Sequence, residues 1–213
     1  MLLFLAGAGI ALSHLGNEWV AMADPGGLAW KAAGIVLLGL YTLSQRAWLA
    51  GAALLFCATG DVLLELVFVA GMAAFAIGHI FYVLAFLEWG RVLGPNKRDY
   101  PLAVLIVLVS LGLLAWLLPG MGDLLIPALI YQAIITTMVA TAFMVKAPML
   151  ARLGAVIFMI SDTLIAAEKF ASVDVIPGAV WITYAGAQIM MAWGMSRVAP
   201  YRDRAAREAP TPA

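Results

Sequence analysis

Long apolar segments separated by short polar breaks dominate this chain. Each segment is close to the roughly 20 residues that cross a bilayer as an α-helix. The breaks, such as ADPGG, GRVLGPNKRDYP and SVDVIPG, are turn-forming sequences. The pattern predicts eight helical spans, at 2–20, 28–44, 47–67, 70–89, 100–118, 123–145, 149–168 and 177–197. We therefore expect an all-α integral membrane bundle of eight transmembrane helices, with residues 1–198 forming a single domain.

Composition supports a membrane protein and excludes several other classes. The chain is 65% hydrophobic and only 11% charged, whereas a soluble domain carries about 25% charged residues. The short alternating segments of a β-barrel are absent from the sequence. The formal net charge is zero, so a nucleic-acid partner is not expected. Cys57 is the single cysteine, and no GxGxxG, P-loop or HExxH motif occurs, so we expect no disulfide, no metal and no cofactor.

Basic residues fall mainly on one side of the predicted bundle. With eight spans, both termini and the even-numbered loops share a side, which holds Arg46, Arg91, Lys97, Arg98, Lys146, Arg152, Arg197, Arg202, Arg204 and Arg207. The other side holds Lys31 and Lys169. This asymmetry places both termini in the cytoplasm, and we expect a multi-pass protein of the bacterial inner (plasma) membrane. The charged, Pro/Ala-rich residues 199–213 are expected to be a disordered cytoplasmic tail.

Two apolar segments share a pattern that centres on an aspartate. The third span reads FCATGDVLLEL and the seventh reads FMISDTLIAAE. Tyr82 follows Asp61 by 21 residues, and Tyr184 follows Asp162 by 22 residues. One interpretation is a parallel repeat of two four-helix halves, residues 1–93 and 100–198, as found in some transporters. The alternative is chance similarity between two apolar segments.

The polar residues of the spans fall at one predicted depth. Asp61 and Asp162 lie at nearly the same level, because their spans run in the same direction. His79 and Tyr82 share a face of the fourth span, and Tyr184 and Gln188 form an i, i+4 pair in the eighth. An ionisable group inside a bilayer costs at least about 2.5–3.5 kcal/mol, so such groups normally face each other or a cavity. We therefore expect one polar cavity that opens toward the outer leaflet.

For three polar residues of the spans, Lys31, Glu65 and His79, a second interpretation stays open. Lys31 and Glu65 either line the cavity or extend to the interface as ordinary rim residues. His79 either takes part in function or is a buried histidine whose nitrogens are satisfied by neighbours.

Five motifs resemble those of the YhhN family of membrane proteins: GDVLLEL, GMAAFAIGHIFYVLAF, YQAIITTM, GAVIFMISDTLIAAEKF and YAGAQ. The resemblance covers roughly the second to eighth spans. It implies a lysoplasmalogenase, which hydrolyses the vinyl-ether bond of lysoplasmalogen to a fatty aldehyde and a glycerophospho-base. Asp61 and Asp162 match the family's paired aspartates and are the catalytic candidates. One departure is Ala32, which follows Lys31 where the family often has proline.

Substrate-binding candidates come from the polar layer and the resemblance together. They are Lys31, Glu65, His79, Tyr82, Tyr131, Ser161, Tyr184 and Gln188. The expected partners are a lysophospholipid substrate and the lipid bilayer.

The implied chemistry needs two carboxyl groups. Protonation of a vinyl ether at its β-carbon gives an oxocarbenium ion, to which water adds. One protonated carboxyl would act as general acid, and one carboxylate would act as base or stabilise the cation, as in glycoside hydrolysis. The residues leave open which aspartate is the acid. A proton-coupled transporter is the alternative function, since membrane carboxylates and repeats also occur there. An intramembrane aspartyl protease ranks last, because Ala58 stands where its Gly-x-Gly-Asp motif needs glycine.

Overall fold

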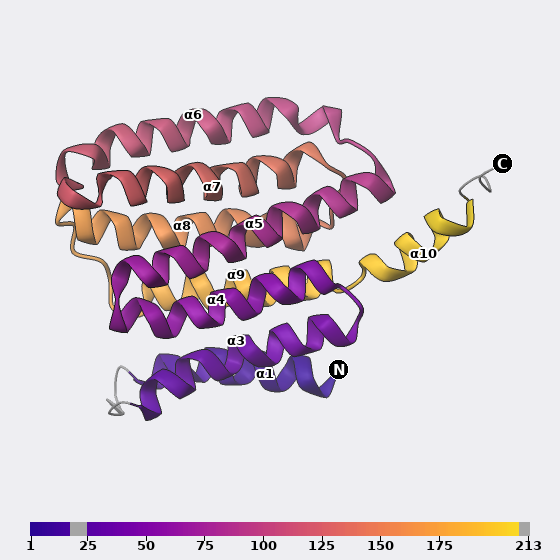
Figure 1. Ribbon diagram of the computed structural model, residues 1–213, viewed down its shortest axis with the longest axis horizontal. Coiled ribbons are helices and arrows are strands. Elements are labelled where there is room, and N and C mark those ends of the chain that lie inside the picture. The colour runs from indigo at the N-terminus through magenta and orange to yellow at the C-terminus, as the bar shows by residue number, and fades with distance from the viewer. Residues whose placement is uncertain (18–24, 209–213) are drawn as a thin grey trace.

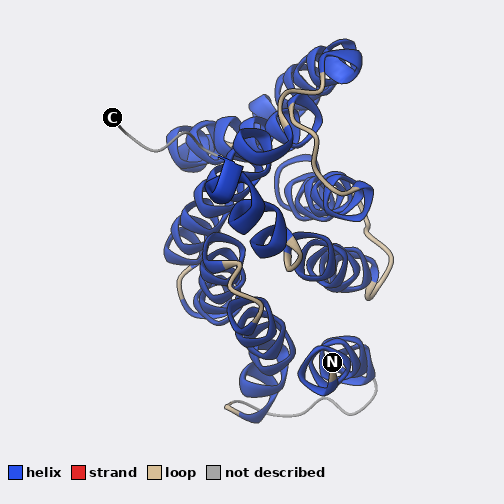
Figure 2. Cartoon of the chain, turned by 90° about the vertical axis from the view of Figure 1, so that its right-hand side faces the viewer, coloured by secondary structure: helices blue, strands red, loops and turns tan. Residues whose placement is uncertain are grey.

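The computed structural model describes residues 1–17 and 25–208, and these are helical almost throughout, with no β-strand. The helices are α1 (Leu2–Ser13), α3 (Gly26–Ser44), α4 (Trp48–Leu66), α5 (Phe68–Leu93), α6 (Tyr100–Leu117), α7 (Leu125–Met144), α8 (Met149–Ala171), α9 (Ala179–Met195) and α10 (Val198–Glu208). Short 3-10 turns occur at His14–Gly16, Lys97–Asp99, Leu118–Gly120 and Gly122–Leu124. The helices from α1 to α9 lie side by side in one bundle (Figure 1), and they appear nearly end-on in the perpendicular view (Figure 2). The predicted all-α class is therefore confirmed.

Six of these helices, α3 to α8, are long and apolar enough to cross a membrane. The other two apolar helices are shorter: α9 has 17 residues, and α1 with its following turn forms the apolar segment Leu2–Gly16. The prediction of eight spans is thus confirmed for six helices and not for its full count. Residues 18–20 of the first predicted span lie outside the described residues.

Neighbouring helices form tight hairpins that bring their backbones together. A single residue, Val67, separates α4 from α5, and its extended backbone reverses the chain. Next to this turn, a Cβ atom added at Gly71 would lie 2.5 Å from the backbone nitrogen and Cα of Leu64. Any side chain at position 71 would therefore push the two helices apart, so the glycine permits the close contact.

The two halves of the chain pack in a related way. Helix α4 packs against α5 in the first half, as α8 packs against α9 in the second. Between the halves, α5 contacts α7 and α9 contacts α3. Helices α6 and α1 lie at opposite edges of the bundle (Figure 1).

The connections with the most basic residues meet at one end of the bundle. The backbone nitrogen of Asn96 donates to the Met144 carbonyl over 2.8 Å, and that of Lys146 donates to the Gly94 carbonyl over 3.1 Å. These bonds join the α5–α6 connection to the α7–α8 connection. The N-terminus and α10 lie at the same end of the bundle (Figure 1).

Helix α10 differs from the disordered tail expected for residues 199–213. The chain is helical as far as Glu208, and residues 209–213 lie outside the described residues. Two ion pairs hold α10: Arg202 donates to Glu88 over 2.8 Å, and Arg46 donates to Asp203 over 2.9 Å. These contacts with distant parts of the chain, rather than a hydrophobic pattern, explain why the helix was not expected.

Candidate functional site

Each of the two aspartates accepts a hydrogen bond from a tyrosine. Asp61 of α4 is 3% exposed, and the Tyr184 hydroxyl of α9 donates to its Oδ2 over 2.7 Å. Asp162 of α8 is partly buried, and the Tyr131 hydroxyl of α7 donates to its Oδ2 over 2.5 Å. Within the described residues no hydrogen bond joins the two carboxyl groups directly. The two carboxyl groups therefore have separate partners.

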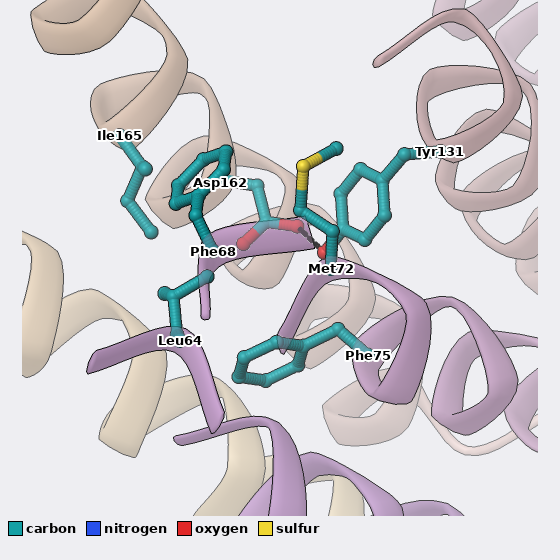
Figure 3. Close-up of a pocket in the computed structure, with 7 residues that line it drawn as sticks. All are labelled: Leu64, Phe68, Met72, Phe75, Tyr131, Asp162 and Ile165. Atoms are coloured by element: carbon teal, nitrogen blue, oxygen red, sulfur yellow. Dashed lines mark hydrogen bonds between the residues drawn. The ribbon is translucent and has the colours of Figure 1, made fainter. Parts of the chain in front are cut away.

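Asp162 and Tyr131 line a pocket with a volume of about 60 Å³ (Figure 3). The rest of its wall is apolar and comes from Leu64, Phe68, Met72, Phe75 and Ile165. Figure 3 shows the Asp162 carboxyl group and the Tyr131 hydroxyl meeting among these side chains. An apolar pocket with a few convergent polar groups is the usual form of a small-molecule site.

Phe75 connects this pocket to the second aspartate. Its ring lines the pocket and also meets the Tyr184 ring edge to face, with centroids 5.9 Å apart. Gly60, the residue before Asp61, leaves space for it, because a Cβ atom there would lie 2.6 Å from the Phe75 ring. Phe75 is thus in contact both with the Asp162 pocket and with the Asp61–Tyr184 pair.

Buried polar atoms without partners lie among the aromatic rings next to the aspartates. His79 is fully buried, and its ring contacts Tyr131 at a centroid distance of 5.4 Å and Phe158 at 4.7 Å. Neither of its nitrogens has a hydrogen-bond partner in the described residues. Gln188 accepts a bond from Tyr82 over 2.6 Å, but its amide nitrogen has no partner there either. Buried polar groups are nearly always hydrogen-bonded, so these atoms are exceptions within the described residues.

Lys31 and Glu65 pair with each other beside Asp61. The Lys31 ammonium donates to Glu65 over 2.6 Å, with side-chain exposures of 18% and 53%. It also lies 5.9 Å from the centroid of the Trp181 ring. Glu65 lies one helical turn after Asp61 in α4. The structure therefore places this pair at a partly exposed rim, next to the buried carboxyl group.

Ser161 is held away from the pocket. Its hydroxyl donates to the Val180 carbonyl over 2.8 Å, which ties α8 to α9. Of the predicted site residues, only Asp162 and Tyr131 line the pocket itself.

The apolar walls of the pocket were not predicted from the sequence. A signal was present, because Ile165 lies one turn after Asp162 and Phe75 lies one turn before His79. In a membrane helix, however, such residues cannot be distinguished from lipid-facing ones by type. Within the described residues no group of three or more His, Cys, Asp or Glu side chains is positioned to hold a metal ion.

Fold and site together define a multi-pass helical membrane protein with a carboxyl group in an apolar intramembrane pocket. The chain belongs to the YhhN family, whose sequence model matches residues 27–195. The resemblance seen in the motifs is thereby confirmed.

Two relatives named lysoplasmalogenase, from Mycobacterium bovis and Mycobacterium tuberculosis, are each 33% identical to the chain over 188 residues. Each alignment covers 82% of this chain and 70% of the relative. No solved structure matches the chain.

Proposed function

We propose that this protein hydrolyses the vinyl-ether bond of lysoplasmalogen-type lysophospholipids. The relatives named lysoplasmalogenase support the reaction class. The observation that carries the proposal is the hydrogen-bonded pair of Asp162 and Tyr131 in an otherwise apolar pocket. A vinyl ether sits at the head of a long apolar chain, so it needs this combination of an acid and apolar walls.

The substrate is proposed to lie with its ether bond next to Asp162 and its alkenyl chain against the apolar walls. Its head group then extends toward the rim formed by Lys31 and Glu65. Glu65 follows Leu64 of the pocket wall directly in α4, which supports this direction. The Lys31 ammonium donates to Glu65 over 2.6 Å and has two further N–H donors, which we propose bind the substrate phosphate.

The proposed reaction starts with a protonated Asp162, because this aspartate lines the pocket. Asp162 gives its proton to the β-carbon of the vinyl ether, and the resulting oxocarbenium ion is balanced by the Asp162 carboxylate, which Tyr131 stabilises. Asp61, held by Tyr184, accepts a proton as water adds to the cation. The hemiacetal then gives its hydroxyl proton to the Asp162 carboxylate, while Asp61 returns its proton to the ether oxygen, and the hemiacetal separates into aldehyde and alcohol. Both carboxyl groups are thereby restored to their starting protonation. The sum is one water consumed and one C–O bond broken.

The unpartnered nitrogens of His79 and Gln188 support a bound water near this site. A buried water normally makes about three hydrogen bonds to groups that otherwise lack partners. We propose that this water is the one that adds to the cation. In this reaction His79, Tyr82 and Gln188 orient the water. Ser161 has a structural role only, because its hydroxyl donates to the Val180 carbonyl.

The test is the release of fatty aldehyde from lysoplasmenyl-ethanolamine by the purified full-length protein. Asp162→Asn and Asp61→Asn are each expected to lose at least about a hundredfold in rate, since each removes one proton-transfer group. Asp123→Asn, in the Gly122–Leu124 turn, is the matched control and is expected to keep the wild-type rate. Saturated alkyl-ether and ester analogues should not be cleaved. Absence of aldehyde with wild type would contradict the function, and full activity of Asp162→Asn would contradict the mechanism.

We further propose that all eight apolar helices cross the membrane as two parallel four-helix halves, with both termini in the cytoplasm of a bacterial inner membrane. The related packing of α4–α5 and α8–α9, and of α5–α7 and α9–α3, supports the repeat. A parallel repeat also favours the second candidate function, a proton-coupled transporter of a lipid-like substrate. Substrate-dependent proton flux in proteoliposomes without covalent turnover would support that alternative.

A further inference from the structure

A second cavity lies at the basic end of the bundle. It has a volume of about 620 Å³, and its lining includes Arg46, Arg197, Arg204 and Tyr201. It lies between the α3–α4 turn and the junction of α9 with α10. Ser196 lines this cavity, and Tyr184 donates to Asp61. The two residues are about 18 Å apart along the helix, so the cavity is remote from Asp61. We refer to this cavity as the basic cleft.

The walls of the basic cleft are fixed in place by ion pairs. Arg46 makes two bonds with the Asp203 carboxylate, at 2.9 and 3.3 Å. Arg202 bonds Glu88 and also donates to the Arg46 carbonyl over 3.1 Å. These bonds hold α10 against the α3–α4 turn, so the cleft is part of the folded structure.

Two of the arginines keep their donors available. Asp203 occupies Arg46, whereas Arg197 and Arg204 are exposed and have no carboxylate partner within the described residues. The guanidinium of Arg197 lies over the Trp193 ring, 4.5 Å from its centroid, which sets its position. The cleft serines donate to carbonyl groups of their own helices, so they supply no donor. The available donors are therefore two guanidinium groups, the Tyr201 hydroxyl and the second N–H of the Gln45 amide, whose first N–H donates to Ser44.

This donor set fits a phosphate group at the level of the lipid head groups. Arginine forms paired hydrogen bonds with phosphate oxygens and stays charged at all physiological pH values. The cleft begins where α3 and α9 end, at Ser44 and Ser196, and Trp193 and Tyr201 are of the type enriched at membrane interfaces. Anionic lipids of the cytoplasmic leaflet attract basic groups at this depth.

We propose that the basic cleft binds the phosphate head group of an anionic phospholipid, at a site separate from the Asp162 pocket. Arg197 and Arg204 hold the phosphate oxygens, and Tyr201 donates a further bond.

The test is native mass spectrometry of the delipidated full-length protein, titrated with phosphatidylglycerol or phosphatidylcholine of identical acyl chains. Wild type should bind phosphatidylglycerol more tightly. R197Q/R204Q should lose roughly 25-fold in that affinity, about fivefold for each arginine, and keep its weak binding of phosphatidylcholine. The control K97Q/R98Q removes two exposed charges at the same end, outside the cleft, and should bind like wild type.

Three results would overturn the proposal. The first is equal affinity of wild type for both lipids, and the second is an equal loss of phosphatidylglycerol affinity in both double variants. The third is displacement of the lipid by glycerol 1-phosphate at the same concentration, which would indicate a site for soluble phosphate. The thermal midpoint is measured alongside, and if R197Q/R204Q is unfolded the single variant R204Q takes its place. An unchanged affinity in folded R204Q would equally contradict the site.

Discussion

Two tyrosine hydroxyls determine how the carboxyl groups of this protein are held. Tyr131 donates to Asp162 inside the pocket, and Tyr184 donates to Asp61 behind Phe75. A hydrogen bond to a charged group contributes about 1.5–3 kcal/mol. Each phenol also orients its carboxyl group, so catalysis in the proposed reaction depends on hydroxyls as well as on acids.

Tyr131→Phe is expected to lower kcat for aldehyde release about tenfold to a hundredfold, because it removes the donor to Asp162 but keeps the ring. KM should change little, since the apolar walls remain. Tyr41→Phe is the control, because the Tyr41 hydroxyl lies 3.5 Å from Ser196 near the other end of the bundle and should leave the rate unchanged. If Tyr131→Phe retained the wild-type rate while Asp162→Asn were inactive, the Tyr131 bond would have no role in catalysis.

The sequence predicted the acids and phenols but not their pairing. Ionisable groups in an apolar segment are conspicuous because of their cost in a bilayer. The bond between Asp61 and Tyr184 joins residues 123 positions apart, and no spacing rule indicates it. Leu64, Met72 and Phe75 were missed because apolar residues are equally suited to lipid and to a pocket.

At the scale of helices, apolar length predicted where elements lie better than where they end. The predicted span 149–168 corresponds to Met149–Ala171, whereas 70–89 underestimates Phe68–Leu93. Helix α5 continues past the apolar segment through Glu88 and Arg91, into the region where Arg202 pairs with Glu88. Helix α10 was missed because its contacts join distant parts of the chain. They are the two ion pairs and the packing of Val198 and Tyr201 against Trp89.

Gly34→Ala tests the contact between α1 and α3. A Cβ atom at Gly34 would lie 2.4 Å from the backbone nitrogen of Ala11, which cannot rotate away. The substitution should destabilise the fold by about 1–3 kcal/mol and lower the thermal midpoint in detergent. Gly9→Ala is the matched control, because its Cβ would meet nothing within 4 Å, and higher helix propensity should make it neutral or slightly stabilising. An unchanged midpoint for Gly34→Ala would show that the two helices are not in close contact.

For the whole molecule, the placement of charge implies an orientation in the membrane. The ion pairs that involve Arg46, Arg152 and Arg202 connect residues of the same bundle end, where α10 also lies. The opposite end carries the α4–α5 turn beside the Asp162 pocket. If the basic end is cytoplasmic, the pocket is nearer the outer leaflet and the basic clefts of all copies face the cytoplasm.

Cysteine labelling in intact cells tests this orientation. Cys57 is buried, so the wild-type protein should not react with a membrane-impermeant maleimide and serves as the control. Asp123→Cys should be labelled from outside, and Arg98→Cys only after the membrane is permeabilised, because α6 separates the two positions. Labelling of both variants from the same side would contradict a membrane crossing by α6, and the reverse pattern would invert the orientation.

The close contact at Gly71 has a mechanical consequence for the pocket. Leu64, Phe68, Met72 and Phe75 all belong to the α4–α5 hairpin, whose two backbones already touch beside the Val67 turn. This wall of the pocket is therefore rigid, because it cannot open without separating two helices that are in contact.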